Sequence, residues 1–374
     1  MIQRILEANG QYDILDPWFE QNHVKCVMLV CGESIKYQNI DKYFRQLSDR
    51  LEIRVVRFTD FQPNPLYQSV VKGVNIFHNE NCEGIIAVGG GSAMDVAKCI
   101  KLYSNMEDGK NYLEQKIIPN NVPFLAIPTT AGSGSEATKF AVIYYEGEKQ
   151  SVSDLSCIPG TVLMDSSVLK TLPEYQKKAT MMDALCHAIE SFWSVNSTKE
   201  SRDYSRIAIK SVMDSMDGYF SNTDSGNAGM LFAANMAGKA INIAQTTAGH
   251  AMCYKITNLF GCAHGHSAAL CNRILFPWML ENTDGCIDPR GEGYLKDIME
   301  EISQTMGCKS AKDGSRKLEG LFKDLKLEVP KATDEQFEKL RISVNPVRLK
   351  NHPIALDIST IDFLYRKILD GERK

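Results

Sequence analysis

The stretch IIAVGGGSAMDVAKCIKLY, residues 85–103, decides the fold class. An apolar run rich in β-branched residues ends at Val88, three glycines follow, and a helix-compatible segment begins near Ser92. Short apolar runs bounded by glycine are typical of strands buried on both faces of a parallel sheet. Glycine lets backbone N–H groups approach an anion, and a helix N-terminus favours negative charge. The stretch therefore predicts either a phosphate-binding strand–turn–helix unit or a plain tight turn with Ser92 as the N-cap.

Two further strand-like runs support a layered α/β domain. CVMLVCG at 26–32 is apolar and ends at glycine, and FLAIPTT at 124–130 ends at a proline and two threonines. A hydroxyl- and glycine-rich loop, AGSGSEAT at 131–138, follows the second run. Helix-like segments separate the runs, so the pattern predicts a doubly wound α/β domain. Two polar loops at neighbouring strand ends favour a dinucleotide crevice over two plain turns.

The second half of the chain has a different pattern. After LPEY at 172–175, windows such as ATMMDALCHAIESFW repeat apolar residues every three or four positions, which predicts amphipathic helices. We see no convincing strand from there to residue 374. A chain of 374 residues also exceeds the size at which a single core stops growing. We expect an α/β domain at 1–170 and an all-helical domain at 171–374.

Composition excludes several classes of protein. Hydrophobic content of 44%, charged content of 24% and a net charge of −4 are ordinary for a globular protein and argue against a general nucleic-acid binder. The N-terminal stretch has no signal-peptide pattern, and no apolar run approaches the roughly 20 residues that a membrane span needs. The eleven cysteines are scattered and odd in number, which favours free thiols in a reducing compartment. We therefore expect a cytoplasmic protein.

The first candidate for metal chemistry is the pair Asp183 and His187. Four residues apart in a helical pattern, they lie on one face of the helix. One interpretation is a polar pair on the helix surface. The other starts from their apolar neighbours, such as Leu185 and Ile189, because a buried carboxylate needs a partner or a metal. His250 and His264 could supply further ligands, and this donor set suits Fe(II), Zn(II), Ni(II) or Mn(II) equally.

With these residues in place, the chain resembles the iron-dependent (group III) alcohol dehydrogenases over nearly its full length. The matching segments are PNP (63–65), GGGSAMDVAK (89–98), PTTAGSGSEAT (128–138), MDALCHAIES (182–191) and GHAMCYKITNLFGCAHGH (249–266). The resemblance implies a Rossmann-like domain that binds NAD(P) and an all-α domain that holds a divalent metal, an architecture shared with dehydroquinate synthase. It implies a cleft between the two domains as the active site.

The resemblance also assigns roles to residues. The implied metal ligands are Asp183, His187, His250 and His264, with Fe(II) as the expected ion and Zn(II), Ni(II) or Mn(II) as alternatives. The implied cofactor-binding residues are Gly32, Asn64, Gly89, Gly90, Gly91, Ser92, Asp95, Thr129, Thr130, Ser133 and Lys149. Family members are commonly dimers or larger, so we expect a homo-oligomer.

Two departures from the family pattern concern the proton and the nucleotide. Many members have a histidine four residues beyond the third ligand, but this chain has Tyr254 there. Either the proton leaves by another route, or Tyr254, Tyr144 or His266 contributes. Members that prefer NAD often carry an acidic residue just after the first strand, where this chain has Gly32 followed by Glu33. We therefore expect NADP(H) to be tolerated and NAD(H) to be usable.

The third departure is Lys239, where the family residue is apolar. The side chain could reach solvent along an apolar stem. Alternatively, it is a cation in the pocket, matched to an anionic substrate. The segments AIESFWSVNSTKES and NPVRLKNHPIAL are similar to members associated with phosphonate metabolism, which reduce phosphonoacetaldehyde.

The expected reaction is the interconversion of a small aldehyde and a primary alcohol with NAD(P)(H), with Tyr254, Lys239 and His266 as the candidate catalytic residues. One alternative is a metal- and NAD-dependent lyase resembling dehydroquinate synthase, although its metal set contains Glu rather than Asp. A second alternative is a non-catalytic relative. The intact set of candidate ligands and the intact glycine turn argue against it.

Overall fold

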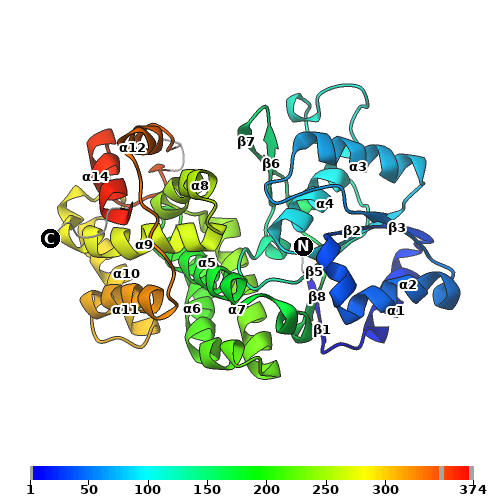
Figure 1. Ribbon diagram of the computed structural model, residues 1–374, viewed down its shortest axis with the longest axis horizontal. Coiled ribbons are helices and arrows are strands. Elements are labelled where there is room, and N and C mark those ends of the chain that lie inside the picture. Colours follow the sequence, from blue (N-terminus) through cyan, green and yellow to red (C-terminus); the bar gives the residue numbers. More distant parts are fainter. Residues whose placement is uncertain (1–2, 345–348, 370–374) are drawn as a thin grey trace. The chain divides into compact units, whose positions relative to one another are not determined.

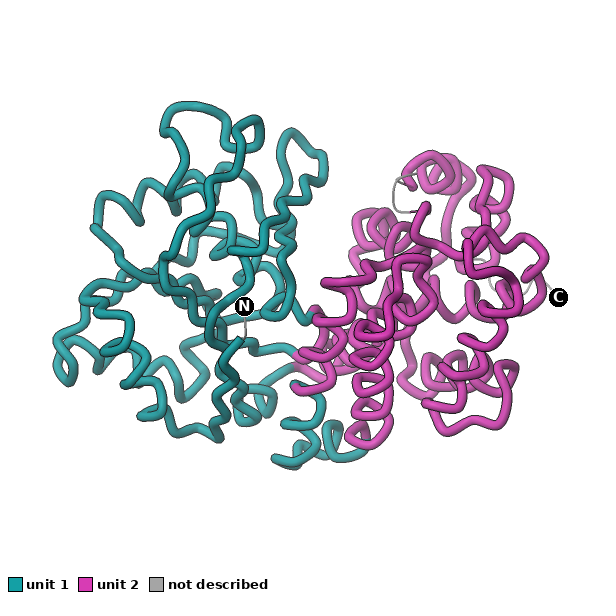
Figure 2. Tube along the Cα trace, turned by 180° about the vertical axis from the view of Figure 1, so that it is seen from behind, with its two compact units in different colours: residues 1–130, 134–172, 217–231 teal, residues 131–133, 173–216, 232–374 magenta. Residues whose placement is uncertain are grey.

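The computed structural model describes residues 3–344 and 349–369, so part of the segment NPVRLK lies outside the described residues. The chain forms two compact units, coloured separately in Figure 2. The first consists of residues 1–130, 134–172 and 217–231, and the second of residues 131–133, 173–216 and 232–374. An α/β fold followed by a helical one is confirmed, because every strand of the described chain ends at or before Asp165.

The first unit is built on a six-stranded parallel sheet (Figure 1). Its strands, in the order in which they pair, are β1 (Arg4–Ala8), β8 (Thr161–Asp165), β5 (Phe124–Pro128), β4 (Gly84–Gly89), β2 (Cys26–Cys31) and β3 (Arg54–Phe58). The three strands expected from the sequence, β2, β4 and β5, are neighbours at the centre of this sheet. Their continuous apolar runs follow from burial on both faces.

Helices cover both faces of the sheet. They are α1 (Asp16–Asn22), α2 (Asn39–Leu51), α3 (Tyr67–Asn79) and α4 (Gly91–Tyr103). Along β2, Met28 and Val30 join the core cluster that contains residues of α3 and α4. The alternate residues Val27 and Leu29 join the cluster that contains residues of α1 and α2. The period-2 alternation of a strand thus gives each side of the sheet its own core.

The strand order reverses direction between β2 and β4. From β2 the chain first adds β3 on one side and then returns to add β4 and β5 on the other. Ligands of open α/β sheets bind outside the carboxyl ends of the strands at such a switch point. Cys31 pairs with Val88, and Gly89 pairs with Pro128, so the loops after β2, β4 and β5 begin at one edge of the sheet.

An antiparallel hairpin of β6 (Phe140–Tyr145) and β7 (Glu148–Ser153) follows the loop after β5. Lys98 of α4 donates hydrogen bonds to residues at the start of this hairpin and to the loop before it. It is fully buried, and its Nζ donates to the carbonyl oxygens of Ser135 (2.6 Å) and Phe140 (2.7 Å) and to Thr138 Oγ1 (3.0 Å). The segment after the expected cofactor loop is thereby fixed to the helix that follows the glycine turn.

The second unit is helical. Its helices are α5 (Glu174–Trp193), α6 (Lys199–Phe220), α7 (Asp224–Ala244), α8 (Ala248–Phe260), α9 (His264–Glu281), α10 (Glu292–Thr305), α11 (Ala311–Asp324), α12 (Asp334–Arg341) and α14 (Ile358–Leu369). The end of α6 and the start of α7 count with the first unit. There Asp224 forms an ion pair of 2.6 Å with Lys170 and accepts a hydrogen bond from Asn9.

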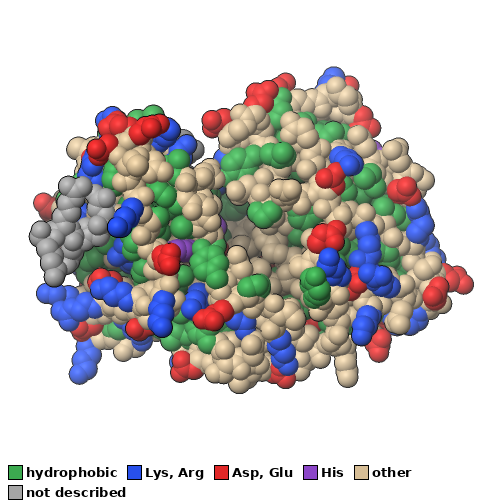
Figure 3. Space-filling view, in the orientation of Figure 1, with side chains coloured by type: hydrophobic (Ala, Val, Ile, Leu, Met, Phe, Trp, Pro, Cys, Tyr) green, Lys and Arg blue, Asp and Glu red, His purple; other side chains and the backbone are tan. Residues whose placement is uncertain are grey.

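The surface carries both signs of charge. On the face drawn in Figure 3, Lys and Arg side chains alternate with Asp and Glu, and neither sign gathers into one large patch. This distribution agrees with the net charge of −4 and gives no support to a nucleic-acid-binding surface. No helix in the described ranges is long and apolar enough to cross a membrane.

Candidate functional site

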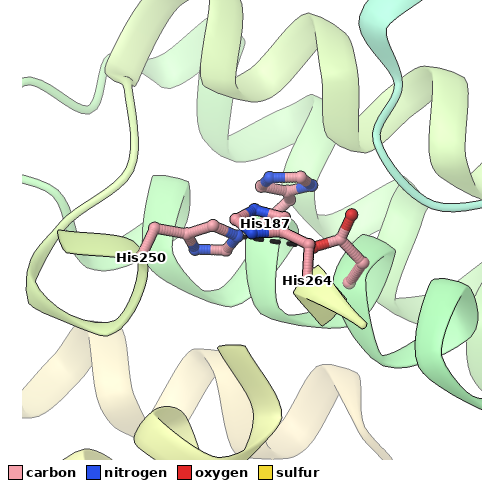
Figure 4. A group of neighbouring side chains, drawn as sticks. His187, His250 and His264 are labelled. Carbon is pink, nitrogen blue, oxygen red and sulfur yellow. Dashed lines mark ion pairs between the residues drawn. The ribbon is translucent and has the colours of Figure 1, made fainter. Parts of the chain in front are cut away.

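Three helices of the second unit bring the four expected metal ligands together. Asp183 and His187 lie on α5, His250 lies on α8, and His264 begins α9. Each residue offers one donor atom, and the four atoms lie within 4.8 Å of one another. Figure 4 shows the three labelled imidazoles turned toward a common centre. The surface-pair interpretation of Asp183 and His187 is therefore wrong, because both side chains are buried in this cluster.

The donor atoms fit a metal ion better than they fit one another. Asp183 Oδ1 lies 3.5 Å from His250 Nε2 and 4.0 Å from His264 Nε2. Asp183 Oδ1 and His250 Nε2 are buried atoms that make no hydrogen bond within the described chain. Two donors each about 2.1 Å from one ion lie roughly 3–4 Å apart. Since an unpartnered buried polar atom costs free energy, the cluster has the chemistry of a divalent metal site.

Burial and neighbouring charges put two of the ligands, Asp183 and His187, in the states that a metal needs. Burial raises the pKa of the Asp183 carboxyl, but the imidazoles of His187, His264 and His250 outweigh burial and hold that pKa well below its usual range. Burial lowers the pKa of His187 to about 4. Asp183 is thus ionised and His187 neutral at neutral pH, the forms that coordinate metals.

Two glycines allow the ligand helices to approach. A Cβ on Gly265, next to His264, would lie 2.0 Å from the carbonyl oxygen of Ala179 and 2.5 Å from Asp183 Cβ. A Cβ on Gly249, next to His250, would lie 2.4 Å from both Glu190 Oε1 and Asn272 Nδ2. Any side chain at these positions would separate α5 from α8 or α9. The glycines of the histidine-rich segment therefore serve close packing around the ligands.

Sequence reasoning missed Glu190, which is fully buried one turn beyond His187 on α5. Its Oε1 accepts a hydrogen bond of 2.6 Å from His250 Nδ1 and one of 2.8 Å from Asn272 Nδ2. Burial raises the pKa of Glu190, but the imidazole of His250 and the surrounding donors lower it to about 2. Glu190 follows His187 by three residues, and this spacing was a signal that the two side chains share a helix face. Thr247, which donates to Glu190, lies 57 residues further along the chain, so this contact left no local signal.

His266 is held by the protein through both ring nitrogens. Nε2 lies 2.8 Å from the carbonyl oxygen of Glu328, so it donates. Nδ1 then accepts from the Tyr175 hydroxyl at 3.0 Å, and this hydroxyl accepts from the Ala263 backbone N–H. Ala263 is the N-cap of α9 and precedes the ligand His264. These contacts give His266 a structural role at the start of α9, while its expected catalytic role stays a prediction.

The other two candidate catalytic residues lie in different surroundings. The ring of Tyr254 stacks on His264, with centroids 5.2 Å apart and planes 30° apart. His264 is the most accessible ligand, with a side chain 37% exposed. The ammonium of Lys239 on α7 lies 5.8 Å from the ring centroid of Tyr204 on α6. Tyr254 therefore lies beside the ligand cluster, and Lys239 makes a cation–π contact with Tyr204.

The expected phosphate-binding residues follow strand ends at the switch point of the first unit. Gly89 adopts a φ of 158°, and α4 begins at Gly91 with Gly90 as its N-cap, so the alternative in which Ser92 is the N-cap is wrong. The backbone N–H of Thr129 donates to the carbonyl oxygen of Gly89. The first N–H groups of α4 have no partner within a helix, so they can bind an anion.

The remaining expected cofactor residues are distributed around this edge. Gly32 follows β2 in an extended conformation, and Asn64 has a left-handed φ of 59° before α3. Lys149 is the second residue of β7 and pairs with Tyr144 of β6. Thr130 lies beside Gly90, where a Cβ would be 3.1 Å from Thr130 Oγ1. Ser133 belongs to the short segment that counts with the second unit.

Asp95 of α4 has donors from the protein on both oxygens. Oδ1 accepts from Ser135 Oγ at 3.0 Å and Oδ2 from the Val142 N–H at 3.1 Å. Burial raises the pKa of this carboxyl, and the nearby ammonium of Lys98 opposes the rise. Asp95 therefore anchors the hairpin, and a direct contact with a cofactor stays a prediction.

The fold and the site define a two-unit protein with a switch-point nucleotide edge and a buried Asp/His metal cluster. Residues 3–166 match the family described as iron-containing alcohol dehydrogenase, and residues 177–340 match the C-terminal part of the Fe-containing alcohol dehydrogenase family. The chain belongs to the iron-containing alcohol dehydrogenase family.

Two similar proteins are named as a dehydrogenase and a reductase. The chain is 32% identical over 233 residues to an NAD-dependent methanol dehydrogenase of Bacillus methanolicus, covering 60% of this chain and 59% of that protein. It is 29% identical over 248 residues to a phosphonoacetaldehyde reductase of Streptomyces viridochromogenes, covering 62% of each. The matches span less than two thirds of these relatives and 28% of an aldehyde-alcohol dehydrogenase of Entamoeba histolytica.

Solved structures share the fold over nearly the whole chain. A sulfoacetaldehyde reductase of Bifidobacterium kashiwanohense, in complex with NAD+, superposes with a TM-score of 0.86 at 24% identity, covering 99% of this chain and 98% of that one. An iron-containing alcohol dehydrogenase of Thermococcus thioreducens gives a TM-score of 0.85 at 21% identity, covering 99% of both chains. These identities show the fold alone.

Proposed function

We propose that the chain is a metal-dependent oxidoreductase that interconverts a small aldehyde and a primary alcohol with NAD(P)(H). The observation that carries this proposal is the convergence of Asp183, His187, His250 and His264, in which Asp183 Oδ1 and His250 Nε2 are buried without a hydrogen bond from the described residues. Family membership and the glycine turn at the sheet switch point support it. The match to this family favours the oxidoreductase over the lyase alternative.

A divalent ion bound by these ligands would polarise a carbonyl group as a Lewis acid, and NAD(P)H would supply the hydride. The chain's own residues provide position and charge. The glycine turn and the first N–H groups of α4 bind a pyrophosphate. Gly32 stands where an acidic residue would repel a 2′-phosphate, so NADP(H) is tolerated, and Glu33 keeps NAD(H) usable.

Tyr254 is the side chain that we assign to proton transfer. It stacks on His264, the ligand that solvent reaches most easily. A phenolic hydroxyl both donates and accepts hydrogen bonds, so it can replace the family histidine as a link between an alkoxide and water. Tyr254→Phe removes the hydroxyl and keeps the stacked ring, and we expect a fall in kcat of about 100-fold.

We further propose an anionic aldehyde such as phosphonoacetaldehyde as the substrate. Support comes from Lys239, a cation at an apolar family position, and from a relative named as a phosphonoacetaldehyde reductase. A fixed ammonium favours an anionic group over an uncharged one of similar size. The proposed homodimer or larger assembly is open to light scattering on the purified chain.

The direct test measures NADPH and NADH oxidation by the metal-stripped chain reloaded with Fe(II) or Zn(II) without oxygen. Phosphonoacetaldehyde and propanal are compared as substrates. We expect turnover only with metal, and a kcat/KM ratio that favours the anionic aldehyde and falls about 10-fold in Lys239→Met. Bound metal and bound nucleotide without turnover of any aldehyde would overturn the proposed function. An unchanged ratio in Lys239→Met would overturn the substrate assignment alone.

A further inference from the structure

Glu190 is surrounded by hydrogen-bond donors that fix its carboxylate in one orientation. Oε1 accepts from His250 Nδ1 at 2.6 Å and from Asn272 Nδ2 at 2.8 Å. Oε2 accepts from the Thr247 N–H at 2.7 Å and the Thr247 hydroxyl at 2.8 Å. The His250 N–H adds a contact of 3.3 Å to Oε2. Glu190 thus contacts both the backbone and the ring of one ligand.

We propose that Glu190 is a positioning residue that fixes the tautomer and the donor strength of His250 and thereby sets the metal affinity of the site. The inference rests on the proposed function only in taking the Asp/His cluster as the metal site. A carboxylate accepts and cannot donate when ionised, so His250 carries a proton on Nδ1. Nε2, which lies 3.5 Å from Asp183 Oδ1, is then the ring nitrogen that would bind the metal.

Three features of the surroundings show that this position is built around the carboxylate. Glu190 has no solvent exposure, so no water competes for its oxygens. Gly249 leaves the space that Glu190 Oε1 and Asn272 Nδ2 occupy, since a Cβ there would lie 2.4 Å from each. Asn272 Nδ2 also donates to the Ala268 carbonyl oxygen, which fixes the direction of the amide.

The charge of Glu190 matters as well as its shape. With Asp183 it supplies a second negative charge beside a divalent ion, so the centre would be neutral overall. A hydrogen-bonded carboxylate also makes the imidazole a stronger donor to a metal. His264 Nδ1 lies 3.7 Å from Cys253 Sγ, and a thiol is a weak hydrogen-bonding group.

Glu190→Gln tests the orientation with a side chain of the same size. The donors around Oε2 require an oxygen there, so the glutamine amide nitrogen would face His250 Nδ1. That nitrogen donates, so it forces the His250 proton onto Nε2, the atom that faces the other ligands. We expect the dissociation constant for Co(II) or Zn(II) to rise by about 10- to 100-fold. The visible absorption of the Co(II)-loaded protein should change in the same variant.

Two variants separate this role from general stabilisation. Glu190→Asp keeps an accepting carboxylate, so metal affinity should recover in part relative to Glu190→Gln. Asp165→Asn is the matched control, because Asp165 is equally buried and accepts from Tyr12 and from the Gly10 and Ser167 backbones in the first unit. We expect it to lower stability and to leave the metal dissociation constant and the Co(II) spectrum unchanged.

Metal binding is measured without turnover, so failure of the proposed reaction does not affect the result. The inference is overturned if folded Glu190→Gln binds Co(II) with wild-type affinity and spectrum. If that variant does not fold, 15N NMR of the Zn(II)-loaded wild-type chain with labelled histidine decides. A signal for His250 with the proton on Nδ1, identified by its loss in His250→Asn, supports the inference, and its absence overturns it.

Discussion

Lys98 in the first unit and Asp183 in the second are both buried charged groups, but their partners differ. Lys98 Nζ has four oxygen atoms within 3.0 Å, all from residues 135–140. Asp183 Oδ1 has no hydrogen-bond donor among the described residues and faces imidazole nitrogens at 3.5 and 4.0 Å. A buried group whose partners come from the chain stabilises the fold. A buried group that faces only other metal-ligating atoms has the surroundings expected of a metal ligand.

The largest effect should come from removing the ligand charge. Asp183→Asn replaces an anionic donor by a neutral one, and we expect metal affinity to fall by more than the roughly 100-fold that loss of an outer contact costs. The measurement is metal content after dialysis together with a competition titration. Asp41→Asn is the control, because Asp41 is also 4% exposed but pairs with Arg45 and Arg57. Equal metal loss in both variants would contradict the comparison.

Lys98→Met tests the buried charged group whose partners come from the chain itself. It removes a buried ammonium that donates to four oxygen atoms of residues 135–140, so we expect the free energy of unfolding of the first unit to fall by about 3–5 kcal/mol. Metal affinity of the second unit should not change. Urea unfolding followed by circular dichroism measures the stability. Lys101→Met should cost less, since Lys101 Nζ donates to two oxygen atoms of Asn120, whereas Lys98 Nζ donates to four oxygen atoms. A loss of metal binding in Lys98→Met would contradict the distinction between Lys98 as a stabilising group and Asp183 as a metal ligand.

His352 sharpens the comparison as a buried imidazole outside the cluster. Both ring nitrogens lack hydrogen-bond partners in the described chain, and burial lowers the pKa to about 4. The unfolded state, with a pKa near 6.5, takes up a proton that the folded state refuses. The contribution of the neutral His352 ring to the free energy of unfolding is therefore complete above pH 6.5. As the pH falls toward 4, the free energy of unfolding decreases by up to about 3 kcal/mol.

The measurement is urea unfolding of the wild type and His352→Leu at pH 7.5 and pH 5. The leucine variant should lose less stability between these pH values, because it has no imidazole to protonate. At pH 7.5 it should be as stable as the wild type or more so, since no hydrogen bond is lost. Equal pH dependence in the two proteins would show that His352 has a partner in solution.

Much of the fold could be predicted from local sequence. The runs at 26–31, 84–89 and 124–128 became central strands because burial on both faces requires uninterrupted apolar residues. The hairpin at 140–153 and the strands β1 and β8 were harder to predict. Strand β1 pairs with β8, which lies more than 150 residues further along the chain, and its burial pattern is mostly exposed. Such a pairing leaves no periodic signal in either segment alone.

The ligand residues were also visible in the sequence, since Asp183 and His187 share a helix face and His250 and His264 occur near one another. Their contacts were not. Glu190 lies one turn from His187, yet its donors, Thr247 and Asn272, are 57 and 82 residues away. Likewise, the contacts of His266 with Tyr175 and Glu328 depend on segments 91 and 62 residues distant.

The sequence by itself indicated the central strands, the glycine turn and the candidate metal donors, because each strand, turn or pair of donors depends on residues close together in the chain. The tertiary structure alone decided which polar groups are paired and which face a common centre. That choice depends on how α5, α8 and α9 pack, and Gly249 and Gly265 permit this packing only because no Cβ stands between the helices. Packing thus gave two buried carboxylates of one helix different surroundings, since Asp183 faces imidazole nitrogens and Glu190 accepts a hydrogen bond from His250.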